Sequence, residues 1–182
     1  THEDIKFEHN LIKINKLNSI KEYNDFILTL NQYIDSDFAL IVQDDGHIVN
    51  ENMWSDEFLE FDYIGAPWPN SRRWKSRFYN KYNLETAETI AKNVNHNQVG
   101  NGGFSLRSKK FLEYSSKFNS CQNIDEDIFL CIYNYQEAIR QGIEFAPTQL
   151  AKDFSYEIYL TKLIKYHERS NKKFDINNHF GW

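Results

Sequence analysis

Two adjacent carboxylates follow directly on a short apolar run. The run Phe38–Val42 (FALIV) leads into Gln43, Asp44, Asp45 and Gly46. Carboxylates without a neighbouring thiolate or histidine cluster suit hard cations such as Mg²⁺ or Mn²⁺, which take one or two carboxylates together with phosphate oxygens. A cation would also relieve the repulsion between two like charges a few ångströms apart. The plainer interpretation is an Asp-Asp-Gly turn, because Asp and Gly are residues that turns prefer.

A second acidic pair, Glu126 and Asp127, lies at the start of a predicted helix, where the helix dipole favours negative charge. A carboxylate at a helix start beside a cleft is also a standard position for a general base. If this pair and the pair Asp44 and Asp45 line one crevice, four carboxylates converge. Such an arrangement is costly without a cation and natural with one.

Two further segments have residue types that suit ligand binding. Gly102 and Gly103, preceded by Asn101, allow the backbone to approach a ligand closely or to form a tight turn. Between residues 68 and 98, aromatic side chains stand beside basic ones. Aromatic faces pack against sugar rings, and Arg or Lys can bind phosphate, but these aromatic side chains serve equally well to cover an edge of the core. They are Trp68, Trp74, Phe78 and Tyr79.

The apolar pattern predicts an α/β chain. Leu11–Leu17 (LIKINKL) alternates as a half-exposed strand does. Ser19–Glu22 is a capping box that opens a helix reaching Ile34, and Phe38–Val42 is the next strand. This β, α, β order is typical of a parallel sheet with a crossover helix. Further strands are expected over 63–66, 104–106 and 143–146, and further helices over 54–61, 84–93, 109–117 and 123–142.

Composition places the chain among ordinary globular proteins. Its 182 residues are 41% hydrophobic and 26% charged, which fits one domain with a proper core. The net charge of −5 argues against nucleic-acid binding, and no apolar run approaches the length of about 18 residues that predicts a membrane span. Cys121 and Cys131 lack metal-binding spacing, which favours a reducing, cytoplasmic setting. We expect one domain over 1–182 with a C-terminal tail over 159–182, as a segment of a longer protein because the chain opens at Thr1.

Longer motifs occur in order along the chain. They are Gln43–Gly46 (QDDG), Phe61–Trp68 (FDYIGAPW), Val99–Arg107 (VGNGGFSLR), Glu126–Asp127 (ED), Phe145–Pro147 (FAP) and Ala151–Ser155 (AKDFS). Over roughly residues 20 to 182, the chain resembles an uncharacterised glycosyltransferase-like family found in bacterial and viral glycan-synthesis loci. The motifs DYIGAPW and VGNGGFSLR are the long and specific ones.

The resemblance implies a GT-A-like fold: a Rossmann-like, mostly parallel sheet flanked by helices, whose opening βα unit is missing here or lies upstream. It implies a metal-dependent glycosyltransferase of hexosyltransferase type. Such an enzyme moves a sugar from a nucleotide-sugar donor, with a UDP-sugar expected, to a hydroxyl acceptor in glycan or polysaccharide synthesis. The implied cofactor is Mn²⁺ or Mg²⁺.

The same resemblance implies the site residues. Asp45, with Asp44, matches the metal-binding acids. Asp127, and less favourably Glu126, matches the acidic pair that supplies the base. The positions that match the binding of donor or acceptor are Gln43, Trp68, Asn101, Gly102 and Gly103.

The chain departs from the family pattern at two places. Gln43 stands at the outer position of the metal motif, so the strict Asp-x-Asp form is absent. The chain also ends Phe180–Trp182 without the terminal His that the family often has, and His179 does not align with that residue.

Two other functions fit the same residues. One is a non-catalytic sugar-binding or scaffolding module that kept the fold and lost donor binding. The other is a Mg²⁺-dependent phosphohydrolase or nucleotidyltransferase, which also uses clustered carboxylates at strand ends, although no nucleophile motif or P-loop is present.

Overall fold

A three-stranded antiparallel sheet lies at the centre of the fold. The computed structural model describes residues 11–156, 175 and 178–182. The strands are β1 (Phe38–Val42), β2 (Tyr63–Gly65) and β3 (Phe104–Ser108), in the order β1-β3-β2. β3 is therefore the central strand, and Leu106 lies opposite both Leu40 of β1 and Ile64 of β2.

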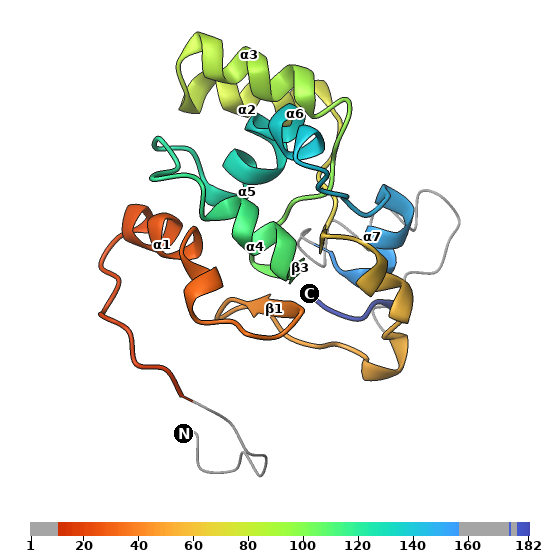
Figure 1. Ribbon diagram of the computed structural model, residues 1–182. Coiled ribbons are helices and arrows are strands. Elements are labelled where there is room, and N and C mark those ends of the chain that lie inside the picture. Colours follow the sequence, from red (N-terminus) through yellow and green to blue (C-terminus); the bar gives the residue numbers. More distant parts are fainter. Residues whose placement is uncertain (1–10, 157–174, 176–177) are drawn as a thin grey trace.

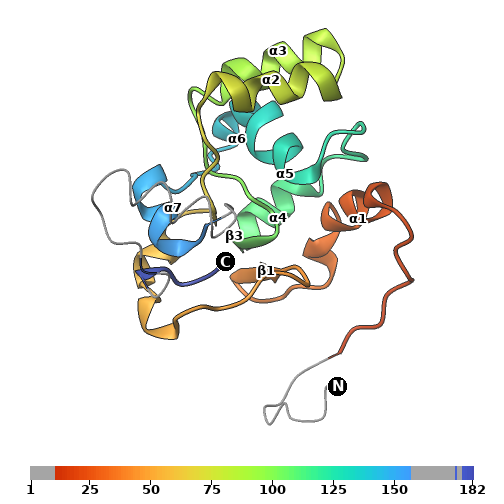
Figure 2. The same cartoon turned by 180° about the vertical axis from the view of Figure 1, so that it is seen from behind.

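The expectation of a mostly parallel, GT-A-like sheet is wrong. Both pairings of the sheet are antiparallel, because β3 leaves the glycine segment and runs back between the two other strands. The predicted strand Leu11–Leu17 has no regular secondary structure, and its trace runs away from the rest of the domain (Figures 1 and 2). It therefore offers β1 no parallel neighbour. The predicted strand over 143–146 is reduced to one isolated parallel bridge, between Phe145 and Tyr63.

β1 is an edge strand with an exposed apolar side. Leu40 and Val42 keep 36% and 46% of their surface exposed, so the run expected to be a buried strand is only half buried. Gln43 donates its N–H to Gly103 O, and Asp37 O accepts from the N–H of Lys109. Alternate residues point the same way in an antiparallel ladder, so the backbone groups of Leu40 and Val42 point away from β3.

Helices pack against this sheet and against one another. α1 (Ile20–Ile27) begins as predicted, with Ser19 Oγ accepting from the N–H of Glu22, and is followed by a short 3₁₀ turn, η1 (Leu30–Gln32). α4 (Lys109–Ser115) follows β3 directly, capped by Ser108 as predicted. The remaining elements of the described chain besides α2 and α3 are η2 (Glu51–Met53), η3 (Asp56–Glu60), α5 (Glu126–Ile128), η4 (Phe129–Tyr133), α6 (Tyr135–Arg140) and α7 (Thr148–Phe154).

The helix expected over 123–142 is divided into three pieces. α5 is followed by η4, a π-helical turn in which Asn134 donates its N–H to Phe129 O, and then by α6. Gly142, with φ of +77°, ends α6 where the sequence predicts a stop.

The segment between residues 68 and 98 contains two helices, α2 (Arg72–Lys81) and α3 (Leu84–Asn93). They lie side by side at the end of the molecule farthest from β1 (Figures 1 and 2). α3 is predicted by the sequence and α2 is not. Ser71 caps α2 by accepting from the N–H of Trp74.

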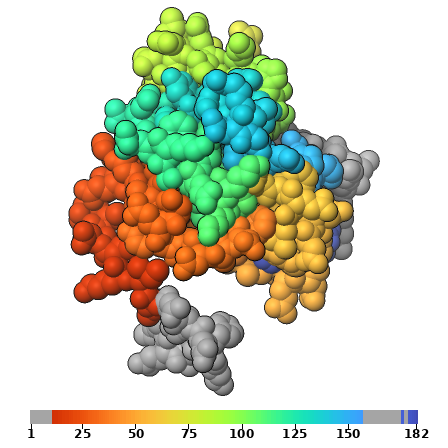
Figure 3. Space-filling view, viewed as in Figure 1, coloured from red at the N-terminus to blue at the C-terminus, as the bar shows by residue number. Residues whose placement is uncertain are grey.

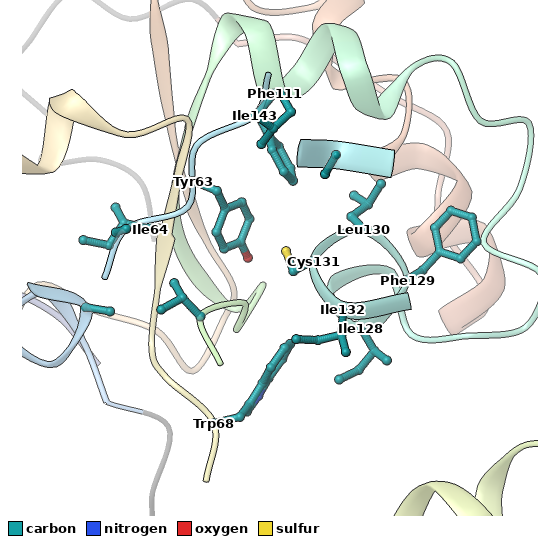
Figure 4. Packing of buried hydrophobic residues seen from close by; sticks show 14 of the residues in the cluster. Tyr63, Ile64, Trp68, Phe111, Ile128, Phe129, Leu130, Cys131, Ile132 and Ile143 are labelled. Carbon is teal, nitrogen blue, oxygen red and sulfur yellow. The ribbon is translucent and has the colours of Figure 1, made fainter. Parts of the chain in front are cut away.

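The main core lies between the sheet and the α5–α6 region. Figure 4 shows the side chains of Tyr63 and Trp68 close to those of Cys131 and Ile132. A second, smaller cluster joins α1 and η1 to β1 and α4 through Ile27, Leu30, Ala39 and Leu112. Most of the expected tail over 159–182 lies outside the described residues, but Phe180 is buried against the rings of Trp54, Phe58, Phe104 and Phe154.

The carboxylate of Asp62, which directly precedes β2, is bonded to the end of β3, to α4 and to the backbone of Glu144. Its oxygens accept from Ser108 Oγ at 2.6 Å, from Lys110 Nζ at 2.8 Å and from the N–H of Glu144 at 2.9 Å. Burial raises the pKa of Asp62, but the bonds from Lys110, Ser108 and Glu144 outweigh it and hold the pKa below its ordinary value.

We predict that Asp62 contributes to acid sensitivity. A carboxyl whose folded pKa is lowered stabilises the fold above its unfolded pKa of about 3.9, and this stabilisation is lost as the pH falls through the folded pKa. Asp62→Asn should lower the free energy of unfolding at pH 7 by about 1 kcal/mol. It should also flatten the fall of that free energy below pH 4, as measured by urea denaturation. Asp35→Asn, at an exposed position, is the control, and equal acid profiles for both variants would contradict the prediction.

Candidate functional site

The turn after β1 presents two carboxylates to solvent. Asp44 and Asp45 are both exposed, and the turn is closed by the N–H of Gly46, which donates to Gln43 O at 2.9 Å. Neither carboxylate takes part in an ion pair or a hydrogen bond with the described residues. Both are therefore available to an external cation.

Gln43 joins this turn to the glycine segment. Its N–H donates to Gly103 O at 2.8 Å, and its side-chain Nε2 donates to Tyr23 Oη at 2.7 Å. The N–H of Gly103 in turn donates to Asn101 Oδ1 at 2.8 Å. A Cβ added to Gly103 would lie 3.0 Å from Gln43 Oε1. The end of β1 and the segment 101–103 are thus held together.

Gly102 joins the glycine segment to the second acidic pair. Its N–H donates to Asp127 Oδ2 at 3.3 Å. A Cβ added to Gly102 would lie 2.2 Å from Glu126 Oε1 and 3.1 Å from Asp127 Cβ, so only glycine fits. Three segments far apart in the sequence therefore meet at Gln43, at residues 101–103 and at the start of α5.

The two acids of α5 lie in different environments. Glu126 is 3% exposed and forms an ion pair with the fully buried Arg107, with Oε1 3.0 Å from Nη2. Burial lowers the pKa of the Arg107 guanidinium, but the charge of Glu126 outweighs it and raises that pKa above its ordinary value. Asp127 is half-buried and lies at the surface side of the same turn, with Oδ1 also accepting from the N–H of Ile128. Of the two, Asp127 is the more exposed.

Arg107 is the residue that the sequence reasoning missed. Its Nε donates to Ser105 Oγ at 3.0 Å, and its guanidinium lies over the Tyr63 ring, 5.3 Å from the centroid. The sequence gives no direct signal for this role, because Arg107 follows the expected strand over 104–106 and its burial within β3 is seen only in the structure. A charge is almost never fully buried without a partner, so this arginine requires a carboxylate elsewhere in the chain.

Trp68 lies in the core. It is 4% exposed and stacks on Trp74, with 5.6 Å between ring centroids. A Cβ added to Gly100 would lie 2.4 Å from Trp68 Cζ3, so the indole packs directly behind the glycine segment. Trp68 therefore supports the backbone that leads to Asn101, and its contacts do not include the carboxylates.

The donor set suits a hard cation that is shared with a ligand. Among the described residues, no three His, Cys, Asp or Glu side chains gather as a group that could hold a metal ion. Mg²⁺ is usually bound by one or two carboxylates together with substrate phosphates, and exposed Asp44 and Asp45 fit that requirement. A pocket of about 520 Å³ beside α6, lined in part by His96, Tyr135 and Glu144, contains none of the predicted site residues.

The fold and the site define a small α/β domain with an acidic turn, a glycine segment and a helix-start acid joined by hydrogen bonds. The chain belongs to the family described as protein of unknown function (DUF5672), whose profile matches residues 6–172. No curated protein and no solved structure matches it significantly. In the part of the chain that the structure describes, none of the helices combines the length and the apolar character needed to cross a membrane.

We predict that Gly102 and Gly103 differ in their tolerance of a methyl group. In Gly102→Ala the new Cβ meets a carboxylate that the buried Arg107 holds in place, so the free energy of unfolding should fall by about 1–3 kcal/mol. In Gly103→Ala the obstacle is the end of the Gln43 side chain, which can move, so the loss should stay below about 1 kcal/mol. Chemical denaturation of both variants measures the difference, and a smaller loss for Gly102→Ala than for Gly103→Ala would contradict it.

Proposed function

We propose that this domain is a metal-dependent glycosyltransferase that moves a sugar from a nucleotide-sugar donor to a hydroxyl acceptor. The observation that carries the proposal is the pair of backbone hydrogen bonds that joins the three segments. Gln43 donates to Gly103 O, and Gly102 donates to the Asp127 carboxylate. The motif resemblance supports the same reading of these segments.

Asp45, with Asp44, is assigned to the metal. Both carboxylates are exposed in the turn after Gln43, which is bonded to the glycine segment, and they would share Mn²⁺ or Mg²⁺ with the diphosphate oxygens of the donor. A divalent cation bound there supplies positive charge that stabilises the diphosphate as it leaves. Gln43 fixes the direction of the turn through its bonds to Gly103 and Tyr23.

Asp127 is assigned as the general base. Its carboxylate would accept the proton of the acceptor hydroxyl as that oxygen attacks the sugar. Glu126 is committed to Arg107, so it acts as a positioning residue that fixes the first turn of α5. The glycine segment beside Asp127 has no side chains at 102 and 103, which leaves its backbone open to close approach by a sugar.

We place this activity in a reducing compartment, the cytoplasm. Cys121 and Cys131 are both free and buried, and burial raises the pKa of each thiol, to about 12 for Cys121. Thiols of this kind act as small apolar side chains.

The first test concerns the metal. Asp45→Ala should remove the Mn²⁺-dependent part of UDP binding, weakening the Kd at least about tenfold, and should abolish turnover. Titration calorimetry with UDP, with and without Mn²⁺, measures the binding. Asp35→Ala removes an exposed charge elsewhere and should bind as the unmodified protein does. Equal Mn²⁺-dependent binding by Asp45→Ala would remove Asp45 from the metal site.

The second test separates chemistry from binding. Asp127→Asn keeps the shape of the side chain but cannot accept a proton, so kcat should fall about 10²- to 10⁴-fold while Mn²⁺-dependent UDP binding stays the same. The assay is sugar transfer or donor hydrolysis with a panel of nucleotide sugars. Full activity in Asp127→Asn would contradict its role as the base. Donor binding without turnover by the unmodified protein, across the whole panel, would favour the non-catalytic sugar-binding module.

A further inference from the structure

α2 carries a row of cations without counter-charges. Arg72, Arg73, Lys75 and Arg77 occupy four of the first six positions of this ten-residue helix, in a chain with a net charge of −5. None of the four takes part in an ion pair with the described residues. Arg73 and Arg77 stand four residues apart, an arrangement of like charges that destabilises a helix. An anionic ligand would reverse this cost.

A groove between α2 and α3 collects part of this charge. It has a volume of about 530 Å³ and is lined by Arg72, Lys75, Ser76 and Tyr79 of α2 and by Ala91 of α3. The four α2 residues follow the spacing i, i+3, i+4, i+7, so they share one face of the helix. The small side chain of Ala91 leaves room on the α3 side. None of the described carboxylates lines the groove.

The chemistry of the lining suits a phosphate group. A guanidinium binds phosphate oxygens in a bidentate manner and an ammonium binds them as a point charge. The hydroxyl of Tyr79, which is 48% exposed, adds a neutral donor, whereas Ser76 Oγ already donates to Arg73 O at 2.8 Å. Lys75 Nζ already donates to the neutral Asn95 Oδ1 at 2.5 Å, which holds the ammonium near the groove without neutralising it.

The opposite face of α2 is committed to the core. Trp74 stacks on Trp68, and Phe78 is 6% exposed and packs edge-to-face on Trp74 at 4.7 Å between centroids. A helix that lies in a membrane surface needs a free apolar face, and α2 has none to offer. A concave, hydroxyl-bearing groove therefore favours a discrete phosphate-bearing ligand over a lipid surface.

We propose that the α2–α3 groove is a binding site for the phosphate group of a soluble phosphate ester or diphosphate. α2 and α3, which line the groove, lie at the end of the molecule away from β1 (Figures 1 and 3). This site stands independently of the proposed transferase activity, because it uses none of the residues assigned to that reaction.

The test uses inorganic pyrophosphate as the probe, with EDTA present so that no divalent cation can bring pyrophosphate to Asp44 and Asp45. Titration calorimetry on the full chain gives the affinity, and ¹⁵N chemical shifts locate the site. Arg72→Gln combined with Lys75→Gln should weaken binding at least about tenfold. The control, Lys13→Gln combined with Lys16→Gln, makes the same change in net charge at exposed positions and should bind as the unmodified protein does.

Shifts confined to Ser76, Ala91 and their neighbours, lost in the groove variant, would support the site. Equal affinity in the groove variant and the control would overturn it. Vesicles of phosphatidylserine and of phosphatidylcholine form the second arm, at about 0.15 M salt. Binding to the phosphatidylserine vesicles without any binding of pyrophosphate would overturn the discrete site in favour of membrane attachment.

Discussion

The buried ion pair between Arg107 and Glu126 is the interaction on which the candidate site depends. Both partners are almost fully removed from water, so neither can be lost without leaving an uncompensated charge, at a cost of about 3–5 kcal/mol. The pair joins the central strand β3 to the first turn of α5. It thereby fixes the carboxylate beside which Gly102 must fit, and the position of Asp127 follows from it.

This arrangement divides the acids of the site into two kinds. Glu126 is neutralised inside the fold and has a structural role, whereas Asp44 and Asp45 are exposed and have no cation among the described residues. Asp127 lies between these extremes, half-buried and bonded to the N–H of Gly102. A fold that pairs the buried Arg107 with Glu126 leaves the charges of the acidic turn for an external ion, which is the electrostatic condition that a shared metal requires.

Local signals in the sequence predicted most of the elements. The caps at Ser19 and Ser108, the apolar run of β1 and the stop at Gly142 are encoded within a few residues, and all are found. The direction of the sheet is not local: an alternating segment such as Leu11–Leu17 forms a strand only if a partner edge accepts it. α2 was not predicted because basic residues around Trp74 and Phe78 obscure the helical spacing of its apolar side chains. The hydrogen bonds that link Gln43, residues 101–103 and Asp127 join segments far apart in the sequence. The residue types were therefore predictable, but the contacts were not.

The open side of β1 affects how the domain behaves in concentrated solution. The backbone groups of Leu40 and Val42 point away from β3 and have no strand partner among the described residues, and their apolar side chains are partly exposed, which is the combination that templates the addition of a further strand. Natural sheets usually protect such an edge strand with lysine, proline or a bulge, and the sequence FALIV contains no lysine or proline. Two copies of the domain that met at this edge would supply each other with the hydrogen-bond partners that a further strand provides.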